Sequence, residues 1–331
     1  MLHLIVGIDT ESDNQWVKES RLKPTYENIY ALPQLDELFR KSGTAPTYLI
    51  TYPVATEPRS AETIRRLAER GRCEIGAHHH VWETPPCDAN EANGLPYALE
   101  IPLHRFEQQL ANLTAAIAKT AGYSPVSYRS GRYGFAAPHT VPLEKAGYLV
   151  DTSVHPLLYE AHRGGPDFVD APLTPYFLSY DSAVREGTSS VLEVPISSAL
   201  NRSVPQWMIR AYGRAPSPYQ TKRVLRLARI VKTIVLRPSY SSLDDMKRLA
   251  RRMVKANAPV LNVMFHSSEA IVGGSPYNKT QGELESFLQR LTDFLEFAVR
   301  ELRAQPVTLR EFHRSWIARG TPGSGAAHPA R

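Results

Sequence analysis

The chain has 331 residues, of which 42% are hydrophobic and 22% charged, a composition typical of a globular protein with a sizeable core. It contains no apolar run long enough to span a bilayer, which argues against an integral membrane protein. The formal net charge of +6 is too small to establish an anionic partner, and without a recognition motif it gives no support to a nucleic-acid role.

Short apolar runs alternate with amphipathic segments through the first half of the chain. Strands are predicted at Leu4–Ile8, Thr47–Tyr52, Arg72–Ala77, Val126–Arg129 and Tyr148–Asp151. Helices are predicted between them at Glu27–Ser42, Ala61–Arg70, Leu103–Ala121 and Pro138–Ala146. Each of these helices is followed directly by a glycine, which is a common signal for a helix C-terminus.

The second half continues the alternation with wider spacing. Strands are predicted at Ser190–Ile196, Val260–Phe265 and Pro306–Leu309, and helices at Leu243–Ala256, from Thr280 onward, and up to Trp316. Thr280 and Glu283 have the spacing of a capping box. Seven or eight strands that alternate with helices predict an α/β fold of the (β/α) barrel type, complete or incomplete, rather than an open doubly wound sheet.

We expect one barrel domain over residues 1–318, with insertions near 156–189 and 201–242. Loops of that length in a compact domain usually serve binding or form helices of their own. Residues 319–331 are rich in glycine and proline and are expected to be a disordered tail.

The second insertion contains a basic amphipathic pattern between residues 222 and 235. Lys222, Arg223, Arg226, Arg229 and Lys232 recur at helical spacing opposite an apolar face. Such a helix is suited to a peripheral membrane contact or to an acidic glycan. A solvated face on a helix that packs against the core has the same pattern, so the alternatives stay open.

The start of the chain lacks the features of a secretory signal. Leu2–Ile8 is short for the apolar region, has no basic start and is followed at once by Asp9 and Glu11. We therefore expect a cytoplasmic location. Cys73 and Cys87 lack the close pairing of a structural zinc ribbon and are interpreted as reduced thiols.

Carboxylates and imidazoles follow two of the apolar runs directly, namely Asp9 and Glu11 after the first strand and His78, His79 and His80 after the third. The carboxyl ends of parallel strands share one edge of the sheet, where such folds place their active sites. Residues two apart on a strand face the same way, so Asp9 and Glu11 pair up, as do His78 and His80. A His-x-His pair with a carboxylate is a common zinc ligand set, so a divalent metal is expected, with Zn²⁺ as the first choice.

The ordered set of motifs resembles the polysaccharide deacetylases, the NodB-homology or carbohydrate esterase family 4 group. The resemblance covers roughly Leu4 to Leu309. It rests on the early aspartate motif, Glu-Ile-Gly-x-His in the third strand, Arg-x-Gly-Arg-Tyr-Gly from Arg129, the later Asp151 and a late apolar-x-His that ends in His266. It implies a distorted (β/α) barrel that removes acetyl groups from N-acetylated sugars with a divalent metal, usually zinc.

The resemblance also implies a role for each matched residue. Asp9 takes the place of the general base that deprotonates a metal-bound water, and His266 that of the general acid that protonates the leaving amine. Arg129 matches the arginine that orients the base, and Asp151 matches a supporting carboxylate. Glu11 and His78 match metal ligands. Amide hydrolysis needs a nucleophilic water, a positive charge on the developing oxyanion and a proton for the nitrogen, and this set is suited to supply all three.

Several motifs depart from the family pattern and indicate a divergent branch. Thr10 separates the two carboxylates, where adjacent aspartates are usual, and Gly131 replaces a proline. Trp82 occupies the position of the second ligand histidine. The third ligand is therefore His80, which the strand period favours, or His79.

Trp82, Arg132 and Tyr133 are the candidates for substrate contact. The first hypothesis is a metal-dependent hydrolase that removes an N-acetyl group from a sugar in a polysaccharide or glycan precursor. A cytoplasmic location then points to a lipid- or nucleotide-linked precursor. The alternative is a catalytically inactive carbohydrate-binding protein on the same barrel. The joint presence of a base, an orienting arginine and an acid argues against this alternative.

Overall fold

The computed structural model describes residues 1–88, 90–214 and 232–319. Its strands are β1 (His3–Thr10), β2 (Pro46–Ile50), β3 (Glu74–His79), β4 (Ser127–Ser130), β5 (Val150–Asp151), β6 (Tyr176–Phe177), β7 (Leu192–Glu193), β8 (Ser198–Leu200), β9 (Thr233–Val235), β10 (Val260–His266) and β11 (Gln305–Pro306).

The helices alternate with these strands through most of the chain. They are α1 (Lys18–Leu22), α2 (Glu27–Tyr30), α3 (Leu32–Ser42), α4 (Tyr52–Thr56), α5 (Pro58–Glu69), α6 (Glu91–Gly94), α7 (Leu103–Ala121), α8 (Thr140–Lys145), α9 (Gln206–Gly213), α11 (Leu243–Lys255), α12 (Gln281–Glu296) and α13 (Leu309–Ala318). Among the described helices, none combines the length and the apolar character needed to cross a bilayer.

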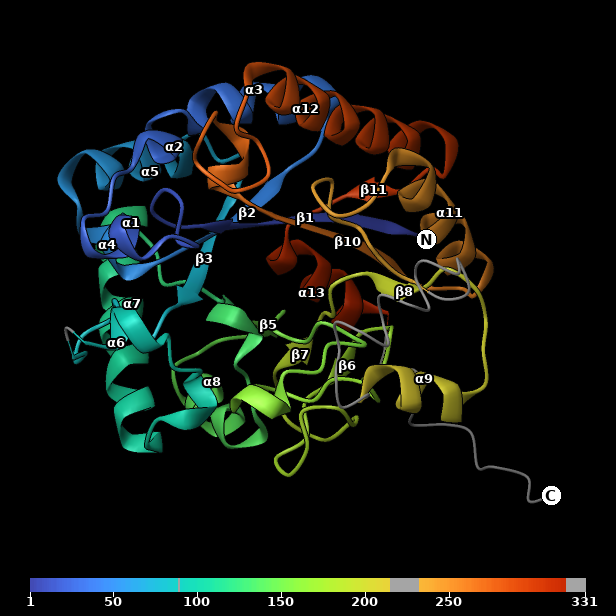
Figure 1. The fold of residues 1–331 in the computed structure, drawn as a ribbon, viewed down its shortest axis with the longest axis horizontal. Coiled ribbons are helices and arrows are strands. Elements are labelled where there is room, and N and C mark those ends of the chain that lie inside the picture. The colour runs from blue at the N-terminus through green and yellow to red at the C-terminus, as the bar shows by residue number, and fades with distance from the viewer. Residues whose placement is uncertain (89, 215–231, 320–331) are drawn as a thin grey trace.

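Seven strands form a parallel, curled sheet in the order β10-β1-β2-β3-β4-β5-β7. β6 adds to β7 in antiparallel orientation, and β11 pairs with the amino end of β1. Helices α3, α5, α7, α11 and α12 lie around the outside of the sheet (Figure 1). The predicted α/β fold with a (β/α) barrel of seven to eight strands is confirmed.

The barrel closes between β7 and β10 through irregular backbone rather than a strand ladder. The Ser197 backbone N–H donates to the Asn262 carbonyl at 3.2 Å, and the Asn262 N–H donates to the Ser197 hydroxyl at 2.8 Å. The Asn262 amide group donates to the carbonyls of Val194 and Pro195 at 3.0 and 3.2 Å. The barrel is distorted at this closure, where one side chain bridges the gap between strands.

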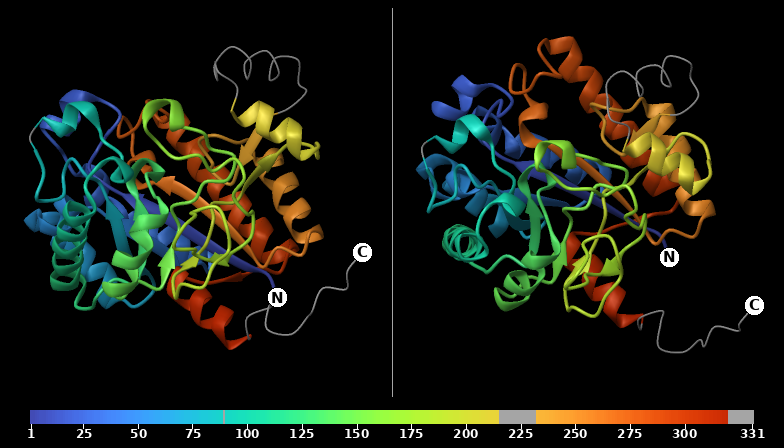
Figure 2. Two further views of the ribbon diagram at one scale, coloured as in Figure 1. Left: turned by 90° about the horizontal axis from the view of Figure 1, so that it is seen from below. Right: turned by 60° about the horizontal axis from the view of Figure 1, so that its bottom comes forward.

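Alternation along the strands separates an outer core from the interior of the barrel. On β1, Leu4, Val6 and Ile8 pack in the outer core with the helices, while Ile5 belongs to a second cluster with residues from β2, β5, β7 and α13. α13 lies at the end of the barrel near the N-terminus (Figure 2). The Arg310 backbone N–H donates to the buried Glu74 carboxylate at 2.8 Å, which fixes the start of this helix. The polar residues of the candidate site lie at the opposite end of the barrel, which is formed by the carboxyl ends of the strands.

Some boundaries differ from those predicted. The helix predicted at Glu27–Ser42 is divided into α2 and α3, with Pro33 in the first turn of α3, where a proline ring is tolerated. The strand predicted to reach Tyr52 ends at Ile50, because α4 begins at Tyr52 with Pro53 in its first turn. The predicted strands around β5 and β7 are shorter in the structure.

The prediction of a basic helix between residues 222 and 235 of the second insertion is wrong at the C-terminal end. Thr233–Val235 form β9 and pair antiparallel with β8, where Ile234 and Val235 are buried. The rest of that helix, residues 222–231, lies outside the described residues, as does the predicted tail apart from Arg319.

Candidate metal centre

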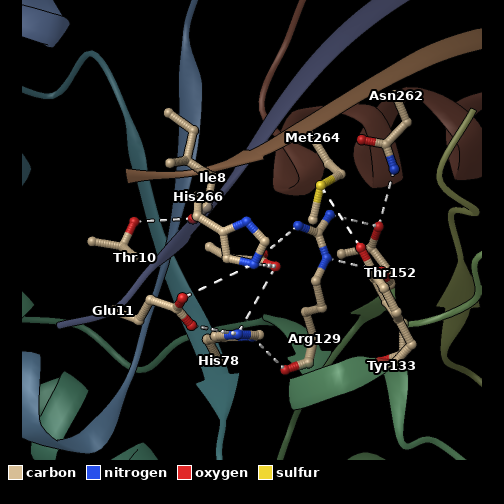
Figure 3. Close-up of polar contacts among 12 residues, drawn as sticks. Ile8, Thr10, Glu11, His78, Arg129, Tyr133, Thr152, Asn262, Met264 and His266 are labelled. Carbon is tan, nitrogen blue, oxygen red and sulfur yellow. Dashed lines mark hydrogen bonds and ion pairs between the residues drawn. The ribbon is translucent and has the colours of Figure 1, made fainter. Parts of the chain in front are cut away.

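Three buried side chains converge at the carboxyl end of the barrel, from β1 and β3. Glu11 Oε2 lies 3.7 Å from His78 Nε2 and 3.2 Å from His80 Nε2, and the two imidazole nitrogens are 3.0 Å apart. Figure 3 shows Glu11 and His78 facing each other. Four ligands around a zinc ion, with bonds of about 2.1 Å, lie roughly 3.4 Å from one another. The triangle therefore has the size of three corners of a tetrahedral zinc site.

The outer nitrogens of both histidines lie close to oxygen acceptors. His78 Nδ1 donates to the Arg129 carbonyl at 3.2 Å, and His80 Nδ1 lies 2.7 Å from the Glu83 carboxylate. Burial lowers the pKa of His80 to about 3, so its ring is neutral. With the ring hydrogens on Nδ1, both Nε2 lone pairs point into the same small space, where they repel unless a cation lies between them. The donor set thus fits a divalent metal.

His79 lies on the other face of β3, away from this triangle. Its Nε2 is 2.8 Å from the Gln109 side-chain oxygen, and its Nδ1 is 3.2 Å from the Tyr128 hydroxyl. Burial lowers the pKa of His79 to about 3. Of the two alternatives left open by the sequence, the structure brings His80 to the triangle and leaves His79 in the outer core.

Gly131 provides the space that His80 occupies. A Cβ atom at this position would come within 2.3 Å of His80 Cδ2 and 2.7 Å of the His79 carbonyl oxygen. We expect Gly131→Ala to weaken zinc binding and to lower the free energy of unfolding by about 1–3 kcal/mol, because the imidazole must move. Zinc titration and thermal unfolding measure the two effects.

Gly282→Ala is the matched control for that variant. It adds the same methyl group on α12, where nothing lies within 4 Å. It should leave zinc affinity unchanged and stabilise the helix by about 0.5–1 kcal/mol. Equal zinc affinity in the two variants would contradict the packing role of Gly131.

Asp9 and Arg129 form a buried ion pair beside the triangle. Arg129 Nη1 donates to Asp9 Oδ1 at 2.5 Å, and Arg129 Nε donates to the Thr152 carbonyl at 3.0 Å. Gly7 lies directly over the guanidinium, since a Cβ there would meet Arg129 Nη2 at 2.8 Å. Figure 3 shows Thr152 and Met264 next to Arg129, and Asn262 donating to the Thr152 hydroxyl. Its position is fixed from several sides.

The charge of Arg129 keeps Asp9 ionised. Burial alone would raise the pKa of Asp9, but the neighbouring Arg129 guanidinium holds it well below its usual range. The second oxygen of Asp9 lies 3.9 Å from His78 Nε2 and 3.8 Å from His266 Nε2. The carboxylate is therefore an available proton acceptor at the edge of the triangle.

His266 comes from β10, whose register with β1 sets it opposite Asp9. Its Nδ1 lies 2.9 Å from Glu269 Oε1 and 3.0 Å from Arg237 Nη2, while its Nε2 faces the cluster. Burial raises the pKa of Glu269, but Arg237 and His266 together lower it to about 2. The ionised Glu269 accepts the Nδ1 hydrogen and orients the ring.

Asp151 does not reach this cluster. It pairs in register with Tyr128 and Glu193, and so lies on the face of the sheet opposite to Arg129. Its carboxylate accepts from the Ser153 hydroxyl at 2.5 Å, and burial raises its pKa to about 6. The next residue, Thr152, contacts Arg129 instead, through its backbone carbonyl and its hydroxyl.

The three candidates for substrate contact have different surroundings. Trp82 is 8% exposed and stacks on His80 with 4.2 Å between ring centroids, so it backs a candidate ligand. The Arg132 guanidinium lies 3.8 Å over the Tyr97 ring and donates to the Tyr97 hydroxyl at 2.7 Å. Tyr133 lies beside the cluster, and its hydroxyl is 3.8 Å from Met264 Sδ (Figure 3). Of the three, Tyr133 has the position best suited to touch a substrate.

Two supporting carboxylates were missed in the sequence, although a signal for them exists. Glu83 follows His80 by three residues, and Glu269 follows His266 by three. In both cases a tight turn after the strand brings the carboxylate to Nδ1 of the histidine. Arg237 has no comparable signal, because it comes from the end of the second insertion.

Comparisons with known proteins agree on the fold. No family model matches the sequence, and no curated protein matches it. A Mycobacterium smegmatis structure that its name assigns to the polysaccharide deacetylases aligns with a TM-score of 0.55 and 14% identity, over 98% of this chain and 95% of its own. A second from Pseudomonas aeruginosa PAO1, likewise assigned by name, has a TM-score of 0.52 and 15% identity over 97% and 91%. The chain has the polysaccharide deacetylase fold.

The fold is not confined to proteins of that name. The Puue allantoinase aligns with a TM-score of 0.54 and 15% identity, over 96% of this chain and 90% of its own. At such low identity, a shared polysaccharide deacetylase fold does not imply a shared substrate. The activity must therefore be argued from the site.

Proposed function

We propose that the protein is a metal-dependent hydrolase that removes an N-acetyl group from a sugar in a polysaccharide or glycan precursor. One observation carries the proposal: the Glu11–His78–His80 triangle lies beside an ionised carboxylate, Asp9, and a carboxylate-oriented histidine, His266. A simple sugar-binding protein has no use for an acceptor and a donor of protons next to a metal site.

The divalent metal would be held by Glu11, His78 and His80, with Zn²⁺ as the first choice. When bound, it would act as a Lewis acid that lowers the pKa of water and stabilises negative charge on the amide oxygen. The chain's own residues then move the protons. Arg129 holds the Asp9 carboxylate in place, so Asp9 can accept a proton from the attacking water.

His266 is placed to return a proton to the leaving nitrogen. Its Nδ1 is held by Glu269, so the proton to be donated is on Nε2, which faces Asp9 at 3.8 Å. The amine leaves as a neutral group because it takes that proton as the C–N bond breaks. Tyr133, at the same edge, is suited to bind the acetyl group.

Further points of the proposal come from the sequence. The cytoplasmic location, the lipid- or nucleotide-linked precursor and a contact with the membrane surface all stay predictions. The named deacetylases of like fold support a sugar as the carrier of the acetyl group.

The metal site is tested by paired substitutions in neighbouring histidines. We expect untagged protein to hold about one zinc per chain, and His80→Asn to lose it because Nε2 no longer completes the triangle. His79→Asn should keep its zinc, since His79 contacts Gln109 on the other face of β3. Elemental analysis of the three proteins gives the answer, and zinc retained by His80→Asn would overturn the ligand assignment.

Activity is tested by acetate release from N-acetyl sugars with the zinc-loaded protein. Release that depends on zinc supports the hydrolase. Sugar binding with zinc in place and no acetate released would instead support the inactive carbohydrate-binding protein.

A further inference from the structure

A row of aromatic rings leads from His266 to the surface. The Trp16 ring meets the His266 ring edge-on with 4.9 Å between centroids. Tyr277 follows at 5.5 Å from Trp16, and Tyr240 follows at 5.4 Å from Tyr277. The row thus begins at the proton donor proposed above and runs outward.

The row is held in place by its own contacts. Trp16 comes from the segment after β1, Tyr240 from the segment after β9, and Tyr277 from the segment after β10. The hydroxyls of Tyr240 and Tyr277 are 2.9 Å apart, and the buried Arg237 guanidinium lies 4.0 Å over the Tyr240 ring. Three separate segments therefore converge to present rings with fixed orientations.

Two rings of the row are open to solvent. Trp16 is 37% exposed and Tyr240 is 54% exposed, whereas Trp82, which stacks on His80, is 8% exposed. Large aromatic rings are normally covered, and exposed ones beside a reactive site are typical of ligand-binding surfaces. This position differs from that of the aromatic residues predicted to contact substrate.

A polar cavity of about 480 Å³ adjoins the row at Tyr277. Its walls include the carboxylate of Glu283 and the polar side chains of Ser239, Asn278, Ser286 and Arg290, each of which also donates a hydrogen bond within the chain. A volume of this size lies within the range of about 300–1,000 Å³ found for small-ligand sites. Rings for the C–H face of a sugar and polar groups for its hydroxyls thus lie side by side.

We infer that Trp16, Tyr277 and Tyr240 form a subsite for a sugar unit next to the one that carries the acetyl group. Sugar rings have a C–H face that packs on aromatic rings, and hydroxyls around the rim that need partners. The substrate is then a glycan of at least two units. The deacetylation of one of these units rests on the proposed function. The binding of a glycan along the row does not depend on it.

Binding is measured with N-acetylglucosamine oligomers of one to four units, by calorimetry on the zinc-loaded Asp9→Asn protein. Affinity should rise with length. Adding Trp16→Ala or Tyr240→Ala to that protein should weaken tetramer binding by about tenfold or more, because aromatic anchors dominate binding energy. Trp16→Phe should restore much of the affinity. Trp207→Ala, which removes a 69% exposed tryptophan on α9, should bind like the parent.

Two measurements separate failure of the subsite from failure of the proposed function. Equal affinity for monomer and tetramer, or unchanged affinity in both ring variants, overturns the subsite. Acetate release from the oligomers is measured in parallel with the native chain. Length-dependent binding without acetate release would keep the subsite and reject the hydrolase, while release at the same kcat/KM for all lengths would keep the hydrolase and reject the subsite.

Discussion

Asp9→Asn is expected to lower kcat for acetate release by about 10²–10⁴-fold while zinc stays bound. An amide cannot accept the proton of the attacking water, whereas the Glu11–His78–His80 triangle is left unchanged. The variant also leaves the Arg129 guanidinium buried without its counter-charge, so its unfolding free energy should fall. Steady-state rates must therefore be measured well below its unfolding temperature, together with zinc content.

Asp13→Asn is the control for that loss of stability. Asp13 lies in the same segment after β1 but accepts hydrogen bonds from the Thr25 hydroxyl and the backbone N–H groups of Glu27 and Asn28, at 2.8–3.0 Å. It should reduce stability with little change in kcat. If Asp9→Asn kept a native kcat with zinc bound, Asp9 would not be the base.

Arg129→Leu is expected to lower the free energy of unfolding by about 3–5 kcal/mol at about pH 7. Arg129 is fully buried, and its removal leaves the buried Asp9 carboxylate without its ion-pair partner. Urea unfolding of the metal-free protein measures the difference, since bound zinc would add its own stabilisation. A loss below about 1 kcal/mol would show that the pair contributes little to the fold.

The same variant has a pH dependence of known sign. In the native chain the pKa of Asp9 lies below its unfolded value, so its stabilisation is present above the unfolded pKa and is lost as the pH falls through the folded pKa. Without Arg129, burial is less opposed and the pKa of Asp9 rises. The folded variant then binds more protons than the unfolded variant, so its unfolding free energy increases as the pH is lowered from about 7 to about 5. The difference in unfolding free energy between the native chain and Arg129→Leu should therefore become smaller over this range. A difference that does not change with pH would contradict this account.

The metal triangle could be predicted because strand alternation is a local property. His78 and His80 share a face of β3, and the same alternation sends His79 to Gln109. The barrel could also be predicted, because its strands and helices alternate in the order that the sequence shows. Asp151 pairs in register with Tyr128 and therefore lies on the outer face, whereas the family resemblance implied that it is a supporting carboxylate of the site.

The rest of the site depends on contacts between distant segments. Arg237 reaches His266 from the end of the second insertion, and Trp16 reaches it from the segment after β1. Neither contact follows from periodicity, because loop paths are set by packing and not by a repeat. Trp82 looked suited to hold a sugar ring, but a close stacking contact with His80 buries it.

The pairing of β1 with β10 links two distant parts of the chain at the reactive site. Asp9 and His266 are neighbours in register although most of the chain lies between them. Contacts at such separation close large loops and form late in folding. During synthesis on the ribosome, β1 cannot pair with β10 until β10 has emerged, so the strand that carries Asp9 and leads into Glu11 has one open edge until most of the protein has been made.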